Sequence, residues 1–516
     1  MKPINRILIT TPNTGWFGKR RWIAPPLTLG LLAAIVPDHY ETSVLDPNRN
    51  DLGFDETVSL IAASDSQVVA ITCLSLEYAP SLHKLAAAVR KAAPQAVIVV
   101  GGVYATTSPD LAMRDGIVDF AVLGEGERRF PRLLKMLDGG EDDISAFDGL
   151  AYRKNGEIIA NPIVTFIKDL DEVPFPDYAK VGFVDYFSTN NQYAVVANAR
   201  YQPYAFMMTS RGCPYKCIYC STHAIDGRKV RWRSAKSVLA EIDRLVGEFG
   251  VKEINFLDDN LVLNRPRFIN ILNGLIERDY DLHWKSLNLA TFLLDDELLE
   301  LMKESKCYQL ILAIESGSQR VLDEVLKKPL KIDKAPAVVA KARELGFETA
   351  ADFIIGSPGE TWDEIRETFR FAEELDVDMV LFHISTPLPT TELYRIAEKE
   401  GLLPAGFDFG NAAFFGFGKG VINTDEFRAE ELHMLRALEW DRINFKTPEK
   451  RERFARMAGV SQEELKKWRR NTIRNLGIYF PDAEGSQNEA PVNNGLLDKN
   501  GGFAKMLNGS NAGKLP

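Results

Sequence analysis

The first 140 residues alternate short apolar runs with segments of helical periodicity. The apolar runs are nearly continuous, which is typical of parallel strands that are covered on both faces. They lie at residues 6–10, 41–46, 67–72, 96–101 and 118–124. Helical patterns fall between them, including residues 27–36, 78–93 and 127–137. This order predicts an N-terminal doubly wound, Rossmann-like α/β domain over residues 1–140.

The alternation breaks over residues 141–200. The segment RKNGEIIANP (153–162) contains an Asn-Gly turn signal and predicts a hairpin. The segment DEVPFPDY (171–178) carries two prolines and is typical of an extended linker. We therefore expect a hairpin and a linker between two larger units.

Strand and helix patterns alternate again over residues 201–394. The predicted strands are residues 204–209, 253–258, 282–289, 308–314, 347–355 and 378–384. Six strands are too few for a closed eight-stranded barrel, so we expect an open, partial (β/α)6 barrel. Residues 395–482 predict a mostly helical, charged C-terminal region that caps the barrel mouth. Residues 483–516 have few large apolar side chains and predict a disordered tail.

Composition narrows the function classes. The 516 residues include 62 Lys and Arg against 72 Asp and Glu, a net charge of −10, which gives no support to a nucleic-acid binder. The apolar runs are shorter than the roughly 20 residues that a membrane span needs, and the N-terminus lacks a signal-peptide pattern. Cys73 and Cys307 are isolated and predicted to be buried structural residues. We expect a cytoplasmic protein without a disulfide framework.

Three of the five cysteines lie in one short segment. In SRGCPYKCIYCST (210–222), Cys213, Cys217 and Cys220 are spaced C-x3-C-x2-C. A structural zinc site takes four ligands, which His223 would have to complete as a Cys3His site. A [4Fe–4S] cluster normally takes four cysteines. With three, one iron lacks a protein ligand and is open to a substrate or cofactor.

This segment follows the first strand of the predicted barrel, and Tyr219 precedes the last cysteine. On these residues the sequence resembles the radical S-adenosylmethionine (SAM) enzymes, whose motif is C-x3-C-x-aromatic-C. The resemblance implies that Cys213, Cys217 and Cys220 hold a [4Fe–4S] cluster whose open iron binds SAM. It also implies reductive cleavage of SAM to a 5′-deoxyadenosyl radical, which abstracts hydrogen from an unactivated carbon.

Later strand ends support the resemblance. They are FLDDN (256–260), LAIESGS (312–318), DFIIGSPGET (352–361) and TPLPTTELY (386–394), in which Thr390 stands where the family usually has glycine. Asp258 and Asp259 could hold SAM or cap the next helix, and Glu315 could reach a ribose or pair within the barrel. The SAM contacts that we predict are Tyr219, Asp258, Asp259, Asn260, Glu315, Ser316, Gly356 and Pro358.

Three loops of the N-terminal domain follow its third, fourth and fifth strands and so share one sheet edge. No G-x-G-x-x-G follows its first strand, which argues against a dinucleotide. The GG and GEGE loops resemble those of the cobalamin-binding domain of B12-dependent radical SAM enzymes. The predicted cobalamin contacts are Ser75, Leu76, Glu77, Gly101, Gly102, Val103, Tyr104, Gly124, Glu125, Gly126 and Glu127. The alternative is an empty Rossmann-like domain.

The D-x-H-x-x-G motif that supplies a lower axial histidine is absent. We therefore predict base-off cobalamin whose lower face meets residues 75–78. His39 and His83 lack the motif's context and are predicted to be ordinary surface or helix histidines. The segment WFGKRRW (16–22) either touches cobalamin or substrate, or is a solvated basic loop.

The function that the resemblance implies is a cobalamin-dependent radical SAM methyltransferase. One SAM would give the radical, a second would methylate cobalamin, and the substrate radical would take the methyl group. The alternatives are a cyclase or rearrangement enzyme with the same cofactors, and a non-catalytic zinc protein. A tRNA methylthiotransferase would need three more N-terminal cysteines. Expected partners are a small-molecule or lipid-like substrate and an electron donor such as flavodoxin or ferredoxin. Five phenylalanines either line an apolar cavity or form a small core: Phe407, Phe409, Phe414, Phe415 and Phe417.

Overall fold

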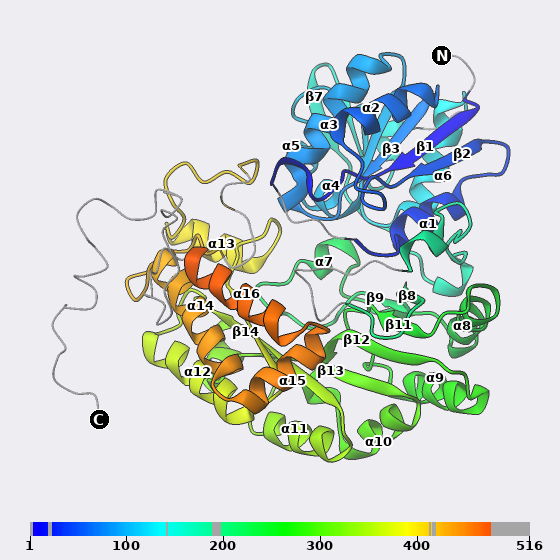
Figure 1. The fold of residues 1–516 in the computed structure, drawn as a ribbon. Coiled ribbons are helices and arrows are strands. Elements are labelled where there is room, and N and C mark those ends of the chain that lie inside the picture. Colours follow the sequence, from blue (N-terminus) through cyan, green and yellow to red (C-terminus); the bar gives the residue numbers. More distant parts are fainter. Residues whose placement is uncertain are drawn as a thin grey trace.

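The computed structural model describes residues 4–18, 23–140, 143–187, 198–411, 414 and 419–475. It has two α/β units followed by a helical C-terminal region, with the short helix α7 (Thr222–Ile225) between the two units (Figure 1). The predicted fold class is confirmed. The predicted tail at 483–516 lies outside the described residues, as do Phe415, Phe417 and residues 19–22 of the basic segment. None of the described helices is both long enough and apolar enough to cross a bilayer.

The N-terminal unit is a seven-stranded sheet in the order β2-β1-β3-β4-β5-β6-β7. Its parallel strands are β1 (Arg6–Thr10), β2 (Glu41–Leu45), β3 (Val68–Thr72), β4 (Val97–Gly101) and β5 (Phe120–Val122). Helices α1 (Leu27–Ile35) and α6 (Gly126–Leu137) pack on one face of the sheet, and α2 (Phe54–Ala63) and α3 (Ala79–Ala92) on the other. Two short helices, α4 (Gly102–Thr107) and α5 (Pro109–Met113), follow β4.

The predicted hairpin is present and extends this sheet. Strands β6 (Leu150–Lys154) and β7 (Glu157–Ala160) are antiparallel, and β6 pairs with β5. The turn residues Asn155 and Gly156 both have positive φ, at 53° and 88°. This conformation matches the two-residue hairpin turn that the Asn-Gly pair predicts.

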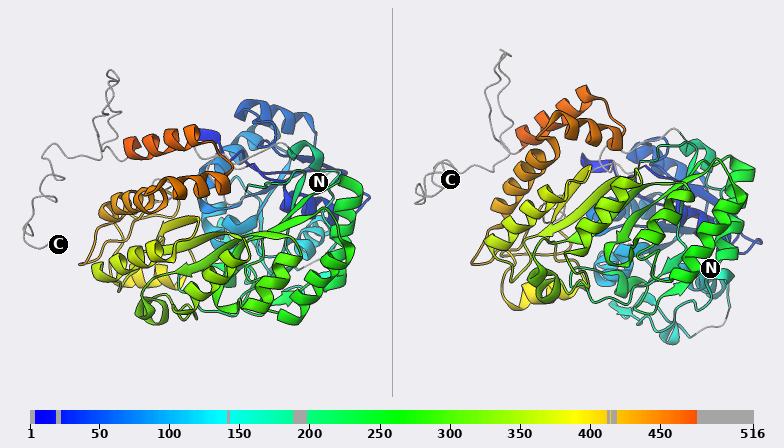
Figure 2. Two further views of the ribbon diagram at one scale, coloured as in Figure 1. Left: turned by 60° about the horizontal axis from the view of Figure 1, so that its bottom comes forward. Right: turned by 90° about the horizontal axis from the view of Figure 1, so that it is seen from below.

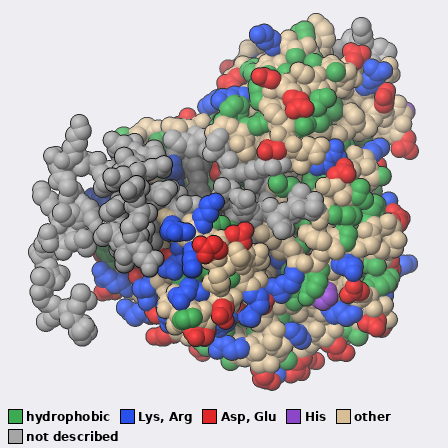
Figure 3. All heavy atoms as spheres, in the orientation of Figure 1, with side chains coloured by type: hydrophobic (Ala, Val, Ile, Leu, Met, Phe, Trp, Pro, Cys, Tyr) green, Lys and Arg blue, Asp and Glu red, His purple; other side chains and the backbone are tan. Residues whose placement is uncertain are grey.

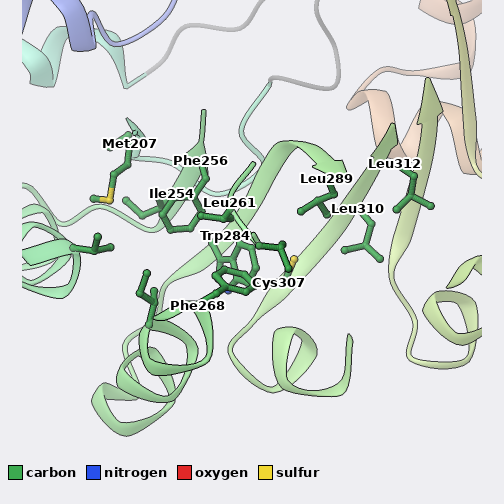
Figure 4. Packing of buried hydrophobic residues seen from close by; sticks show 14 of the residues in the cluster. Met207, Ile254, Phe256, Leu261, Phe268, Trp284, Leu289, Cys307, Leu310 and Leu312 are labelled. Atoms are coloured by element: carbon green, nitrogen blue, oxygen red, sulfur yellow. The ribbon is translucent and has the colours of Figure 1, made fainter. Parts of the chain in front are cut away.

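The second unit is an open half-barrel of six parallel strands in the order β15-β14-β13-β12-β11-β8. The strands are β8 (Tyr204–Met207), β11 (Glu253–Phe256), β12 (His283–Ala290), β13 (Cys307–Glu315), β14 (Glu348–Ile355) and β15 (Met379–Ile384). Its covering helices are α8 (Ala235–Phe249), α9 (Arg265–Arg278), α10 (Asp296–Glu304), α11 (Lys334–Glu344) and α12 (Trp362–Leu375). Buried side chains from both layers, including Trp284, Phe256 and Phe268, form the core between them (Figure 4). Cys307 belongs to this core, as predicted.

Helices of the C-terminal region pack on the half-barrel, in a core that includes Ile311, Ala350 and Met379 of β13, β14 and β15 (Figure 2). They are α13 (Glu392–Lys399), α14 (Ala429–Phe445), α15 (Pro448–Ala458) and α16 (Gln462–Asn475). On the edge strand β15, the Asn444 side chain accepts from the Val380 N–H at 2.8 Å and donates to the Val380 carbonyl at 2.9 Å. The Asn444 amide thus makes the two hydrogen bonds with Val380 that a neighbouring strand would make. This covers part of an edge that could otherwise pair with another chain.

The charge of the surface is mixed. Lys and Arg side chains are interspersed with Asp and Glu over the face drawn in Figure 3. The net charge of −10 is therefore not gathered into one acidic field on this face.

Candidate active site

The cysteine loop leaves β9 (Ser210–Arg211), which pairs with β10 (Arg231–Trp232). Gly212, with φ of 86°, has no room for a side chain, because a Cβ would lie 2.9 Å from the carbonyl oxygens of Gly227 and Lys229. In the middle of the loop the backbone of Ile218 bonds to Leu326 and Leu393, at 3.2 and 2.9 Å. The loop is therefore held at its base and its centre while its three cysteines stay partly accessible.

The three thiols lie on one loop, as an iron–sulfur cluster requires. No group of three or more His, Cys, Asp or Glu in the described part of the chain surrounds a single-ion position. A cubane differs from such a site because it takes each thiolate on a different iron. His223 follows the loop on α7, and its pKa is lowered, chiefly by burial. Burial raises the pKa of Cys213, and that of Cys217 to about 11, so cluster binding must release protons.

The residues after β11 serve two different purposes. Asp258 is buried and accepts hydrogen bonds from Thr209 N–H at 3.1 Å, Thr209 Oγ1 at 2.7 Å and Ser210 Oγ at 2.5 Å. Its carboxylate thus fastens the end of β8 to the start of the cysteine loop. Asn260 is buried, and its Oδ1 has no hydrogen-bond partner among the described residues. Buried acceptors are rarely left unsatisfied, so this oxygen suits a donor on a ligand such as the ammonium group of SAM.

Asp259 and Glu315 connect the strand ends to the cysteine loop. Asp259 accepts from Thr222 Oγ1 at 3.1 Å. Glu315 lies at a bulge of β13, with φ of 75°, and accepts from Tyr219 Oη at 2.9 Å and Lys328 Nζ at 2.8 Å. Of the two roles weighed for Glu315, the structure shows pairing within the barrel, and a ribose contact stays a prediction.

Ser316 turns away from the cysteine loop. It is fully buried, and its Oγ lies 3.2 Å from Thr368 Oγ1 of α12. The side chain therefore faces the helix layer and anchors the loop after β13. A direct contact of the Ser316 hydroxyl with SAM finds no support in this placement.

A glycine turn follows β14. The N–H groups of Gly356 and Ser357 donate to Glu360 Oε2 at 2.7 and 3.0 Å, and Pro358 completes the turn. Gly356 has φ of 80°, and a Cβ there would lie 2.3 Å from Leu432 Cδ1 of α14. The turn therefore needs glycine both for its conformation and for the close approach of α14.

Thr390 adopts φ of 70°, the left-handed region that glycine favours. Radical SAM enzymes usually have glycine at this position. Thr390 replaces it but keeps a backbone conformation that glycine adopts easily. This β-branched residue is therefore a strained position in the loop that precedes α13.

Polar lumen residues that sequence reasoning missed lie on β14 and β15. His383 Nε2 is 3.3 Å from Asp352 Oδ1, and the side chains are 43% and 24% exposed. Burial alone would lower the pKa of His383, but Asp352 outweighs this effect and the pKa is raised. Both residues interrupt otherwise apolar strands, which is the signal that could have revealed them.

The predicted cobalamin loops lie together at the carboxyl edge of the N-terminal sheet. Backbone of the GG and GEGE loops is partly accessible there, at Gly101, Gly102, Gly124 and Gly126. Leu74, which the sequence did not single out, follows β3 and is 56% exposed. Small residues beside an exposed apolar side chain suit a large planar ligand such as a corrin. Ser75, Glu77 and Val103 are partly accessible, whereas Leu76 is buried.

Tyr104 and His83 belong to a chain of polar side chains under the GG loop. Tyr104 is 1% exposed, and its hydroxyl lies 2.9 Å from His83 Nε2. His83 Nδ1 lies 3.0 Å from Asp115 Oδ2. His83 is a helix histidine, as expected, because it lies on α3, and it is also the half-buried centre of a Tyr–His–Asp chain. Cys73 is buried at the end of β3, as predicted.

The sheet edge that carries the predicted cobalamin loops, which we call the cobalamin edge, lies against the segment that contains the cysteine loop. Helix α4 packs against α7, and a Cβ on Gly124 would lie 3.6 Å from the Ile225 carbonyl oxygen. The carboxylates of Glu125 and Glu127 pair with Arg211 and Arg231, which flank the cysteine loop on β9 and β10. The two glutamate side chains thus contact the half-barrel, and cobalamin contacts from this loop stay a prediction.

Comparisons with known proteins agree with this arrangement. The radical SAM superfamily model matches residues 207–372, and the B12 binding domain model matches residues 17–134. An uncharacterized methyltransferase of Pyrococcus horikoshii is 32% identical over 406 residues, 78% of this chain and 84% of the relative. The cytidylyl-2-hydroxyethylphosphonate methyltransferase of Streptomyces wedmorensis is 29% identical, over 73% of this chain and 78% of that protein.

Two solved structures share the fold. The methyltransferase TsrM of Kitasatospora setae, with cobalamin and a [4Fe–4S] cluster bound, has a TM-score of 0.63 at 19% identity, covering 78% of this chain and 80% of that one. OxsB, with aqua-cobalamin and SAM bound, has a TM-score of 0.67 at 16% identity, covering 91% and 72%.

The fold and the cysteine loop define a radical SAM enzyme. With its B12 binding domain, the chain belongs to the cobalamin-dependent radical SAM enzymes. Its cofactors are a [4Fe–4S] cluster, SAM and cobalamin.

Proposed function

We propose that the protein is a methyltransferase that adds a methyl group to an unactivated carbon of a small molecule. The observation that supports the proposal is that the predicted cobalamin loops pack beside the cysteine loop, through α4, α7 and the paired glutamates. The methyltransferase relatives support it. When bound, the cluster with SAM supplies a 5′-deoxyadenosyl radical and cobalamin carries a methyl group.

In this proposal the chain's own residues bind and orient the reactants. Cys213, Cys217 and Cys220 hold the cluster, and Asn260 Oδ1 accepts from the ammonium of SAM. Glu315, fixed by Lys328, keeps Tyr219 of the cysteine loop in place.

We propose a polar substrate. Phe407, Phe409 and Phe414 pack on one another, with ring centroids 5.1 and 5.2 Å apart, and Phe409 packs on Tyr394 at 4.7 Å. This packing supports the small core, of the two roles considered for the phenylalanines. The His383–Asp352 pair offers a hydrogen-bonding site instead, so we propose a small molecule with a hydroxyl or an anionic group. A cytoplasmic location and a flavodoxin or ferredoxin as electron donor complete the proposal.

A nucleoside assay tests the reaction type without a known substrate. The protein is reconstituted anaerobically with iron, sulfide and cobalamin, then given SAM and a strong reductant. Mass spectrometry follows S-adenosylhomocysteine and 5′-deoxyadenosine, with Cys217→Ala as the control for the cluster. A methyltransferase should form both products, and the variant should lose 5′-deoxyadenosine because it lacks one cluster ligand.

The second candidate is a cyclase or rearrangement enzyme. It is favoured by the anaerobic magnesium-protoporphyrin IX monomethyl ester cyclase of Rubrivivax gelatinosus, which is 28% identical over 404 residues, 76% of this chain and 69% of that protein. Such an enzyme does not transfer a methyl group, so it would form 5′-deoxyadenosine without S-adenosylhomocysteine. That result would refute the methyltransferase proposal and leave the radical SAM assignment intact.

A further inference from the structure

Four charged side chains are buried where the two α/β units meet. Glu125 ends the loop after β5, Glu127 lies in the first turn of α6, and Arg211 and Arg231 come from β9 and β10. Their side chains are only 3%, 11%, 11% and 5% exposed. We call these four residues the interdomain clamp.

Hydrogen bonds join all four residues of the clamp. Arg211 bridges the two carboxylates, with Nη1 3.0 Å from Glu125 Oε1 and Nη2 bonded to Glu127. Arg231 also pairs with Glu125 Oε1, and it donates to the Ile167 carbonyl at 2.9 Å. The other oxygen, Glu125 Oε2, accepts from Ile167 N–H at 2.7 Å. The guanidinium of Arg211 thus fixes the distance between two carboxylates of the other unit, as a planar, forked donor can.

Stability alone is a poor explanation for this arrangement. Buried ion pairs must offset the loss of hydration, and apolar side chains of similar volume often close an interface equally well. What paired charges add is a single geometry, because any shift of one unit leaves a charge buried without its partner. The clamp also adjoins the cluster loop in the sequence, because Arg211 is two residues before the cluster ligand Cys213.

We infer that the interdomain clamp sets the position of the cobalamin edge relative to the cysteine loop, so that the two cofactors are held in one fixed arrangement. Its members are positioning residues that act through the loops they join. Burial alone would raise the pKa of Glu127, but Arg211 outweighs this effect and the pKa is lowered, so the carboxylate stays charged at neutral pH. The inference rests on the two cofactors and not on whether a methyl group is transferred.

Pulsed dipolar electron paramagnetic resonance tests the inference. The holoenzyme is prepared with cob(II)alamin and the reduced cluster, each of which carries an unpaired electron, and the distribution of their separation is measured. The variants are Arg211→Gln, Glu127→Gln, the double variant and Arg211→Lys. Arg128→Ala is the matched control, because Arg128 lies on the same helix as Glu127, α6. Its ion pair with Glu172 is on the surface, where the Arg128 and Glu172 side chains are 63% and 59% exposed.

The wild type and Arg128→Ala should show one narrow separation. Arg211→Gln and Glu127→Gln should each lose it, with iron, sulfide and cobalamin content retained. The double variant should be no broader than either single one, because both remove the same interaction. Arg211→Lys keeps the charge without the fork, so its distribution should lie between those of the wild type and Arg211→Gln.

A narrow, unshifted separation in Arg211→Gln would overturn the inference. So would loss of cobalamin from Glu127→Gln but not from Arg211→Gln, because Glu127 would then act as a cobalamin contact. If Arg211→Gln fails to take up the cluster, Glu127→Gln decides the question, since it leaves the sequence of the cysteine loop unchanged.

Discussion

Replacing Gly356 by alanine should destabilise the half-barrel more than the same change at Gly359. Both residues lie in one turn with nearly equal positive φ, 80° and 87°, so alanine is strained at both by about 1–2 kcal/mol. Only at Gly356 does the new methyl group collide, 2.3 Å from Leu432 Cδ1, whereas at Gly359 the nearest atom is Val325 Cγ2 at 3.8 Å. Overpacking a filled core costs about 1–3 kcal/mol, which is the difference expected between the two variants.

The assay is urea unfolding of the two variants and the wild type under identical anaerobic conditions. Leu432 is 1% exposed, so it has no open space into which to rotate. Adding Leu432→Ala to Gly356→Ala should therefore cost less than Leu432→Ala costs in the wild type, since the cavity accommodates the methyl group. Equal unfolding free energies for Gly356→Ala and Gly359→Ala would refute the reasoning, because they would mean that α14 moves aside without cost.

Three further changes follow from the same structure. Asn444→Ala removes both hydrogen bonds to the edge of β15 and leaves buried groups of Val380 unsatisfied. The variant should therefore have an unfolding free energy in urea about 2–4 kcal/mol lower than that of the wild type. A change within error would contradict the role of this amide in satisfying the edge strand. Thr390→Gly should relieve the left-handed strain and raise the unfolding midpoint in urea slightly, because the strain of about 1–3 kcal/mol exceeds the entropic cost of glycine. Burial raises the pKa of Glu360 from 4.5 to about 8. Between these values the folded state binds more protons than the unfolded state. The contribution of Glu360 to the unfolding free energy therefore falls as pH rises from about 5 to 8. Glu360→Gln cannot ionise and should show a smaller decline in urea midpoint between pH 5 and 8, and an unchanged decline would be evidence against a protonated carboxyl.

The strands and the hairpin were predictable because their signals are local. Apolar runs specify a strand wherever both faces are covered, and Asn155-Gly156 specifies its own turn. The fifth strand was predicted at 118–124, but β5 spans only Phe120–Val122. It does not start earlier because the Asp119 carboxylate accepts from Ile98 N–H, at 2.7 Å. A side chain that replaces a ladder bond is invisible to a count of apolar residues.

The candidate site was predictable only where one segment carries the chemistry. The cysteine spacing identifies the cluster loop without any knowledge of the fold. The partners of Glu125 and Glu127 lie 84 to 106 residues away along the chain, and no local pattern distinguishes a cobalamin contact from a charge that pairs across a domain boundary. The His83–Tyr104 contact and the Asn444 amide depend likewise on elements that meet only after folding.

Because the two remaining cysteines are buried, chemical labelling of thiols in the folded protein can measure how much of it carries a cluster. Cys73 and Cys307 are 0% and 2% exposed, and burial raises the pKa of both thiols, to about 12 for Cys73. An alkylating reagent that needs an accessible thiolate should leave both untouched in the folded chain. Labelling of the folded protein therefore reports on the cysteine loop alone. Three modified positions mark an empty loop and none marks a complete cluster, so the mean number of modified cysteines falls as the fraction of molecules with a cluster rises.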